Sequence, residues 1–309
     1  MGTFSVLLLL FAVVLVNGWT DAPNAIATPV AVGVLSFPAA VALAALCNLL
    51  GVVTSAAVSQ EVARTLYSIA DFGEDALTAL AAALAATVLW GVLAWRFGIP
   101  TSESHGLIAG LTGAALALGA DRLRLGPLLR VGIGMLLSLI LGWGMGSTLR
   151  RLLPRKADTL YKNGQILGAA LTAFFHGAQD GQKFLGVLAL VLTLGHSFAV
   201  PAWAGWAVAG VMALGTLMGG RRIIETVGKR MVTLDPRSGF SADLGCAGAL
   251  LLCTLFGLPV STTHAKGAAI LGAGSTPDVG VASSLGAAWL LTFPGCGFLA
   301  FGLVKLLLV

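Results

Sequence analysis

The chain has 309 residues, of which 57% are hydrophobic and only 10% are charged. A soluble domain carries about 25% charged residues, so this composition excludes an ordinary water-soluble protein. The net charge of +5 comes from basic residues gathered in a few short loops, without interleaved aromatics, which is typical of membrane topology and not of nucleic-acid binding. The composition therefore predicts an all-α integral membrane protein that contacts lipid and no nucleic acid.

Apolar stretches recur along the whole chain near the length of about 20 residues that a helix needs to cross the hydrocarbon core. About ten such elements are predicted, and the first and sixth are interrupted by polar residues. Their ranges are 3–16 (resuming after 25), 37–58, 76–97, 106–120, 127–145, 166–175 (resuming after 183), 197–218, 242–256, 267–274 and 283–308.

Two polar clusters in the first half each recur 159 positions later. The cluster 17–25 (NGWTDAPNA) corresponds to 176–183 (HGAQDGQK), so that Asp21 aligns with Asp180. The cluster 98–106 (GIPTSESHG) corresponds to 257–265 (GLPVSTTHA), in which glycine, proline, serine and histidine all coincide. One offset from two independent clusters predicts an internal duplication, with a first repeat at 1–150 and a second at 151–309 in one membrane domain.

The charges of corresponding loops differ between the repeats. Residues 60–75 contain one arginine against four acidic residues, whereas the corresponding loop, 221–237, is basic. Because basic loops stay cytoplasmic, these two loops are predicted to lie on opposite sides of the membrane. The repeats are therefore predicted to have inverted topology, with both termini outside and with broken or re-entrant helices at the polar clusters.

The two aspartates lie within long apolar segments, beside Pro23 and Gly181, which are predicted to disrupt a regular helix. An ionised carboxylate inside the bilayer costs about 2.5–3.5 kcal/mol even on the lenient scales, so such residues usually face an ion, a cavity or a proton pathway. Asp21 and Asp180 are predicted to serve cation or proton coupling. The alternative is an interfacial aspartate that caps a helix at the membrane surface.

Each Gly-x-Pro-x-Ser-x-x-His copy predicts the start of a helix, since proline cannot continue the preceding one and serine is a good N-cap. A helix start presents free N–H groups and a positive dipole end, which suit an anion. Two repeat-related starts that meet inside the membrane would form a transporter's binding site; two ordinary capped surface loops are the alternative. The predicted anion-binding residues are Thr101, Ser102, Ser104, Gln179, Lys183, Ser261, Thr262 and Thr263.

His105 and His264 lie one turn into these helices and are predicted to take part in coupling, as proton carriers or ligand donors. Asn24, three residues after Asp21, offers a second oxygen and makes the pair candidate Na⁺ ligands. In the second copy Lys183 replaces this asparagine, and an ammonium cannot ligate a cation. At most one full cation site is therefore predicted to survive.

These clusters resemble the inorganic phosphate transporter (PiT) family. The resemblance is carried by 18–25, by 176–183 followed by Gly186, by both Gly-x-Pro-x-Ser-x-x-His copies, and by the loops 220–229 (GRRIIETVGK) and 234–240 (LDPRSGF). It implies an inverted-repeat symporter that moves phosphate by alternating access. The sequence departs from the family pattern at Thr20 and Gln179, and Gly181-Gln182-Lys183 is similar to bacterial members that couple to protons and carry metal-phosphate.

The sequence thus predicts a secondary active phosphate symporter of the cytoplasmic membrane, coupled to protons or sodium. It predicts no enzyme, no resident metal and no cofactor other than co-transported Na⁺ or H⁺. The alternatives are a symporter of sulfate or another oxyanion, and a passive anion channel. An intramembrane phosphohydrolase would need a nucleophile with an adjacent base, and no His-x-x-x-His spacing is present. Oligomeric state, a homo-oligomer included, stays open.

Overall fold

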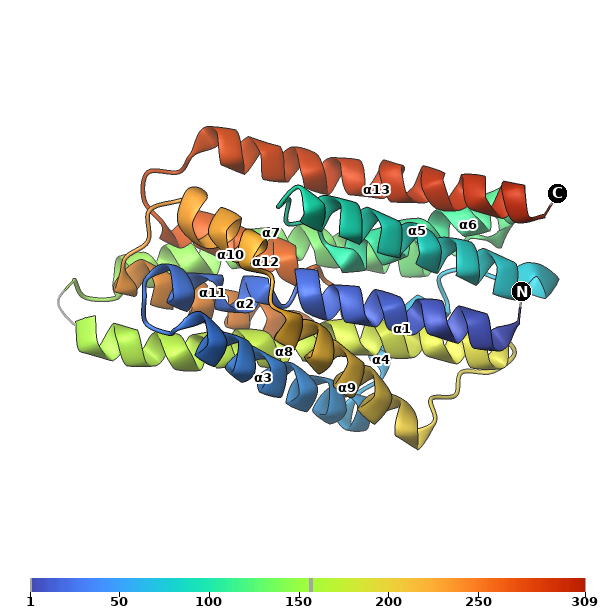
Figure 1. Ribbon diagram of the computed structural model, residues 1–309, viewed down its shortest axis with the longest axis horizontal. Coiled ribbons are helices and arrows are strands. Elements are labelled where there is room, and N and C mark those ends of the chain that lie inside the picture. The colour runs from blue at the N-terminus through green and yellow to red at the C-terminus, as the bar shows by residue number, and fades with distance from the viewer. Residues whose placement is uncertain (1, 156–157, 309) are drawn as a thin grey trace.

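The computed structural model describes residues 2–155 and 158–308, which form an all-helical bundle without a β-strand (Figure 1). Six of the described helices are long and apolar enough to cross a membrane, with 3–31 taken as one, or seven if a bent pair counts as a span. The protein is therefore multi-pass, although ten spans are not confirmed. The α-helices are α1 (Thr3–Thr20), α2 (Pro23–Ala31), α3 (Phe37–Val58), α4 (Glu61–Tyr67), α5 (Ala76–Arg96), α6 (Glu103–Leu118), α7 (Leu125–Leu152), α8 (Asp158–Thr193), α9 (Ala202–Met218), α10 (Arg221–Ile224), α11 (Pro236–Leu255), α12 (Thr262–Ala273) and α13 (Val279–Leu307).

The first polar cluster interrupts a helix, as predicted. Helix α1 ends at Thr20, and α2 begins at Pro23, so that Asp21 and Ala22 lie at the junction. Proline has no backbone N–H and favours the first turn of a helix, which explains why a new helix starts here. Asp21 therefore lies at the junction of two helices inside one long apolar segment.

The second cluster does not interrupt a helix, and the prediction that Gly181 would disrupt one is wrong. Helix α8 runs unbroken through residues 176–183 because this copy has no proline, and a single glycine is tolerated within a helix. Its glycines pack against α3 instead: a Cβ on Gly177 would meet the backbone oxygen of Asn48, and one on Gly181 would meet Val52. The second copy thus presents Asp180 from a regular helix.

Two hairpins turn in the middle of the bundle (Figure 1). Helices α5 and α6 form the first hairpin, and both extend from its turn to the end of the bundle that carries the chain termini. Helices α11 and α12 form the second hairpin, and both extend from its turn to the opposite end. The two turns have the same geometry, since Gly98 and Gly257 end α5 and α11 with φ angles of 67° and 61°. Glycine is favoured in this left-handed conformation, which explains its presence at both turns.

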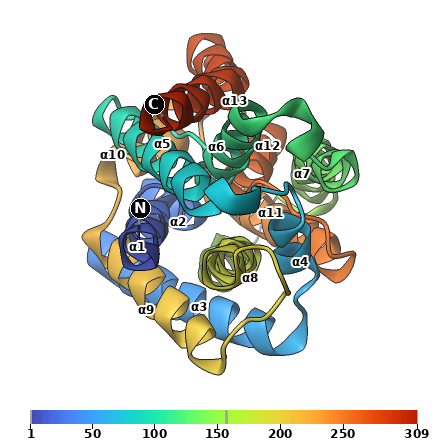
Figure 2. The same cartoon turned by 90° about the vertical axis from the view of Figure 1, so that its right-hand side faces the viewer.

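The basic segments gather at the end of the bundle opposite the termini. Arg150, at the end of α7, contacts Asp235, which precedes α11, at 3.1 Å. Helix α10 and the π-helix after it, Glu225–Arg230, lie in the half of the bundle nearer that end (Figure 1). Figure 2 views the bundle from the opposite end, which carries both termini. At the other end Arg124 pairs with Asp71 at 3.6 Å, so an acidic neighbour offsets part of the positive charge there.

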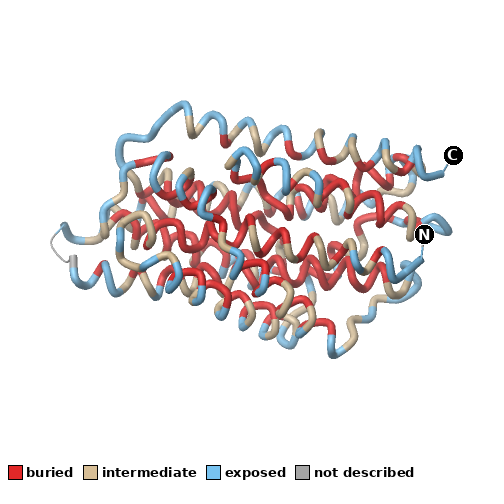
Figure 3. The backbone as a smooth tube through the Cα atoms, viewed as in Figure 1, coloured by how far each residue is buried: buried red, intermediate tan, exposed pale blue. Residues whose placement is uncertain are grey.

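Glycines let several helices approach at backbone distance, and buried residues run through the centre of the bundle (Figure 3). Gly18 of α1 faces the backbone oxygen of Met212 of α9, while Gly51 of α3 faces that of Phe174 of α8. In lipid, helix association depends on such close packing because apolar surface gains little from leaving hydrocarbon. These contacts hold α1, which ends just before Asp21, against α9, and they hold α8, which carries Asp180, against α3.

A methyl group added at Gly177 is expected to destabilise the protein by about 1–3 kcal/mol, because it would force α8 away from the backbone of α3. Gly144→Ala on α7 is the matched control, since nothing lies within 4 Å of its added Cβ. Thermal unfolding in detergent, followed by tryptophan fluorescence, compares the two variants. Equal melting temperatures for both would contradict this account of the α3–α8 contact.

Candidate functional site

Asp21 lies at the α1–α2 junction and contacts the starts of two other helices. Its Oδ1 accepts a hydrogen bond from the Thr263 hydroxyl of α12 at 2.8 Å, and its Oδ2 accepts one from the backbone N–H of Glu103, the first residue of α6, at 3.0 Å. The side chain is fully buried. One carboxylate therefore joins the broken helix to the first turns of α6 and α12.

Asp180 receives donors from three helices. Its Oδ1 accepts hydrogen bonds from the Ser104 hydroxyl at 3.0 Å and from the Lys183 ammonium at 2.6 Å. Its Oδ2 accepts one from the Asn17 amide at 2.9 Å, and Nε2 of His176 lies 3.3 Å away. A buried carboxylate is tolerated only when its oxygens are paired in this way.

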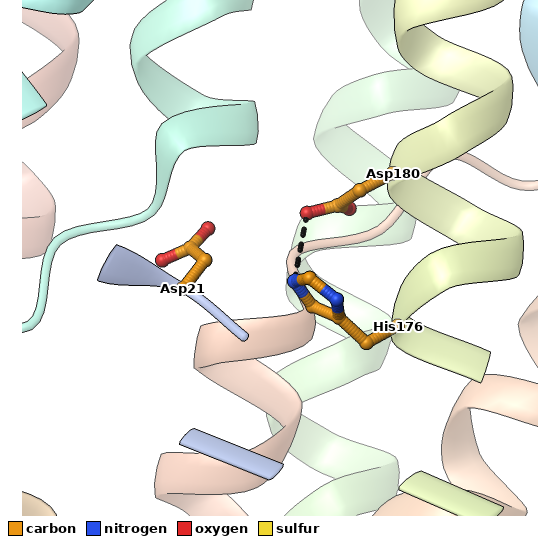
Figure 4. A group of neighbouring side chains, drawn as sticks. All are labelled: Asp21, His176 and Asp180. Atoms are coloured by element: carbon orange, nitrogen blue, oxygen red, sulfur yellow. Dashed lines mark ion pairs between the residues drawn. The ribbon is translucent and has the colours of Figure 1, made fainter. Parts of the chain in front are cut away.

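Asn17 and His176 bring the two aspartates together, although neither was among the predicted site residues. The Asn17 amide donates to both carboxylates, at 2.9 Å to Asp180 and 3.4 Å to Asp21. Ligand atoms of Asp21, His176 and Asp180 lie within 4.8 Å of one another, which is a spacing that could hold a metal ion (Figure 4). The sequence did carry a signal for them, because each precedes an aspartate by four residues and residues four apart share a helix face.

The two Gly-x-Pro-x-Ser turns meet, which confirms both predicted N-caps. The Ser102 hydroxyl accepts from the backbone N–H of His105, and the Ser261 hydroxyl accepts from that of His264, each at 3.2 Å. The Ser261 hydroxyl in turn donates to Ser102 Oγ at 2.8 Å. The positive ends of α6 and α12 thus meet beside Asp21 and Asp180, an arrangement that favours an anion.

Asn24 and Lys183, which are related by the offset, make different contacts. The Asn24 amide donates to the Thr263 hydroxyl at 3.2 Å, while its Oδ1 has no hydrogen-bond partner among the described residues. The Lys183 ammonium donates to Asp180, to the Ser104 hydroxyl at 2.7 Å and to the backbone oxygen of Val260 at 2.5 Å. Both side chains are buried, and buried polar atoms nearly always have a hydrogen-bond partner, so the unpaired Oδ1 of Asn24 is unusual.

Gln179 and the two histidines lie beside the cluster rather than within it. The Gln179 amide donates to Thr254 at 2.9 Å and to the Leu258 carbonyl at 3.3 Å, so it fixes the α11–α12 turn. The rings of His105 and His264 pack edge to face, with centroids 5.5 Å apart, and neither ring hydrogen-bonds to an aspartate in the described part of the chain. Their role in coupling stays a prediction.

Thr101 and Thr262 flank the capping serines and are buried. The Thr262 hydroxyl has no partner among the described residues, and neither has Oε1 of the buried Glu103. Each unpartnered buried polar group costs about 1–3 kcal/mol, so a ligand that satisfied several of them would bind with that gain. Unpaired polar atoms of Glu103 and Thr262 thus lie in the first turns of α6 and α12, next in sequence to Ser102 and Ser261.

A second buried ion pair was not predicted. Lys266 of α12 pairs with Asp243 of α11, and its ammonium also donates to the Thr28 hydroxyl and the Ala25 carbonyl of α2, each at 3.2 Å. The sequence did contain a signal, since both charges adjoin or lie in apolar stretches. The pair ties α2, α11 and α12 together.

Comparison with known proteins places these features in a family. A profile described as the phosphate transporter family matches residues 17–156 and 150–300. The chain is 36% identical over 303 residues to a probable low-affinity inorganic phosphate transporter of Rhizobium meliloti (strain 1021), covering 92% of this chain and 90% of that protein. A protein of the same description from Bacillus subtilis (strain 168) is 33% identical over 297 residues, covering 90% and 89%.

A solved structure described as the sodium-dependent phosphate transporter has the same fold. The TM-score is 0.87 at 21% sequence identity, and the alignment covers 99% of this chain and 98% of the other. The fold, the buried polar cluster and the sequence matches agree. The chain accordingly belongs to the phosphate transporter family, as a multi-pass membrane transporter and not an enzyme.

Proposed function

We propose that the protein is a secondary active symporter that moves inorganic phosphate across the cytoplasmic membrane, driven by a proton or sodium gradient. The descriptions of its relatives support phosphate as the substrate. The anion would bind between the starts of α6 and α12, where the hydroxyls of Ser102, Ser261 and Thr262 would donate to its oxygens. The contact between Ser102 and Ser261 would open to admit it.

One observation carries the proposal of symport: two buried carboxylates lie beside the proposed anion site, and a single ammonium, that of Lys183, pairs with Asp180. Two like charges 4 Å apart repel by about 4 kcal/mol at an effective dielectric constant of 20. An oxyanion added next to Asp21 and Asp180 would therefore bind poorly alone. A cation or proton that entered with it would offset this repulsion, so coupling follows from the charges.

We also propose that 1–150 and 151–309 are inverted repeats that move against each other. The supporting geometry is the opposite direction of α1–α2 and α8 in Figure 1, together with the two hairpins that enter from opposite ends. The basic end would face the cytoplasm, which would place both termini outside. Alternating access would then expose the same central site to each side in turn.

Uptake of labelled phosphate into proteoliposomes tests this function, with proton and sodium gradients imposed separately. Saturable uptake that requires one gradient is expected, and uptake that ignores both would indicate a passive channel. If unlabelled sulfate competed with labelled phosphate as effectively as unlabelled phosphate does, the assignment of phosphate as the substrate would be wrong.

Ser102→Ala combined with Ser261→Ala is expected to lower uptake by about 10-fold or more, since two hydroxyl donors to the anion and two helix caps would be lost. Ser138→Ala is the matched control, because the hydroxyl of this buried serine donates to the Met135 carbonyl within its own helix. Unchanged uptake in the double variant would place the anion elsewhere.

A further inference from the structure

The ammonium of Lys183 occupies a position that three oxygen atoms define. It contacts the carboxylate of Asp180, the hydroxyl of Ser104 and the backbone oxygen of Val260, at 2.5–2.7 Å. The side chain is 1% exposed, so water contributes little to its coordination. A carboxylate, a hydroxyl and a carbonyl are the ligands that a hard metal cation also prefers.

The same set of groups recurs around Asp21 without an ammonium, and each set combines residues of both repeats. At the offset of 159, Asp21 corresponds to Asp180, Thr263 to Ser104 and Asn24 to Lys183. The correspondence extends to contacts, since Thr263 donates to Asp21 as Ser104 donates to Asp180. Asn24 contributes an amide in place of the lysine, and its Oδ1 has no partner among the described residues although the side chain is 4% exposed.

From this correspondence we propose that Lys183 is a tethered cation that permanently fills one of two repeat-related cation positions. The other position, formed by Asp21, Asn24 and Thr263, is the one that a mobile cation uses. Transport then moves one cation for each phosphate, where two equivalent sites would move two. This inference rests on the proposed symport and specifies its stoichiometry.

The tether has an energetic consequence. A fixed ammonium offsets the charge of Asp180 as a bound cation would. Because it never crosses the membrane, it adds no free energy from the ion gradient to phosphate transport. Each co-transported charge multiplies the attainable accumulation by about 50-fold per 100 mV, so the tether lowers the limiting phosphate gradient by that factor. The protein therefore reaches a smaller ratio of internal to external phosphate and uses fewer cations for each phosphate that it moves.

Lys183→Asn tests the proposal, because it gives position 183 the residue found at the corresponding position 24. Co-uptake of labelled Na⁺, or of protons, is measured together with phosphate uptake in proteoliposomes, and it is expected to rise by one cation per phosphate relative to the unmodified protein. Lys183→Arg, which keeps the charge, should leave the ratio unchanged. Asn24→Lys, the mirror variant, should remove the dependence of any remaining phosphate flux on the cation.

A binding measurement keeps the test decisive if Lys183→Asn does not transport. Titration of the purified variant with Na⁺, and separately with acid, should show one more binding event than the unmodified protein, read from the shift in melting temperature. An unmodified protein that carries two cations per phosphate, or a variant that gains neither flux nor binding, overturns the inference. A protein that moves no phosphate at all overturns instead the proposed function.

Discussion

Asp180→Asn is expected to lower phosphate uptake by about 100-fold or more and also to destabilise the protein, whereas Asp21→Asn should lower uptake alone. The difference follows from their partners. Asp180 is the counter-charge of the buried Lys183, and removal of one member of a buried ion pair costs about 3–5 kcal/mol. Asp21 accepts from Thr263 and Glu103, and asparagine can retain an acceptor there.

Uptake assays and thermal unfolding, carried out on the same purified variants, separate the two effects. Asp180→Asn combined with Lys183→Met is the control, since it removes both charges and should recover much of the stability without recovering transport. If Asp21→Asn retained full, gradient-dependent uptake, the proposed role of that carboxylate in coupling would be wrong. If Asp180→Asn melted like the unmodified protein, the ion pair would contribute little to the fold.

Lys266→Met is expected to destabilise the protein by about 3–5 kcal/mol, which corresponds to a fall in melting temperature on the order of 5–10 °C. The ammonium pairs with Asp243 and also donates to Thr28 and Ala25 of α2. Its loss would leave the Asp243 carboxylate, which is fully buried, without a counter-charge.

Lys266→Met combined with Asp243→Leu is the matched control. A buried ion pair replaced as a whole by apolar groups is often neutral or stabilising, so the double variant should melt closer to the unmodified protein than either single variant. Additive losses in the double variant would show that the two side chains act independently. Because α2 and α12 also carry Asn24 and Thr263, the uptake of each variant should be measured alongside its stability.

The sequence determined the membrane class, the polar clusters and the two capped helix starts, because composition and local turn chemistry are encoded in neighbouring residues. The offset of 159 identified Ser102 and Ser261 as equivalents, and the structure places their hydroxyls 2.8 Å apart. Local chemistry also explains the break before Pro23. The same local reasoning failed at Gly181, where packing of α8 against α3 keeps the helix continuous.

Only the tertiary structure decided which polar residues meet. Asn17 bridges two aspartates from different helices, and Lys266 pairs with Asp243 through contacts that no spacing in the sequence specifies. The hairpins at 97–102 and 256–261 likewise depend on how helices pack, since an apolar stretch of 20 residues can either cross the bilayer or turn back within it. Packing at glycine contacts sets these distances, and side-chain chemistry then acts across them.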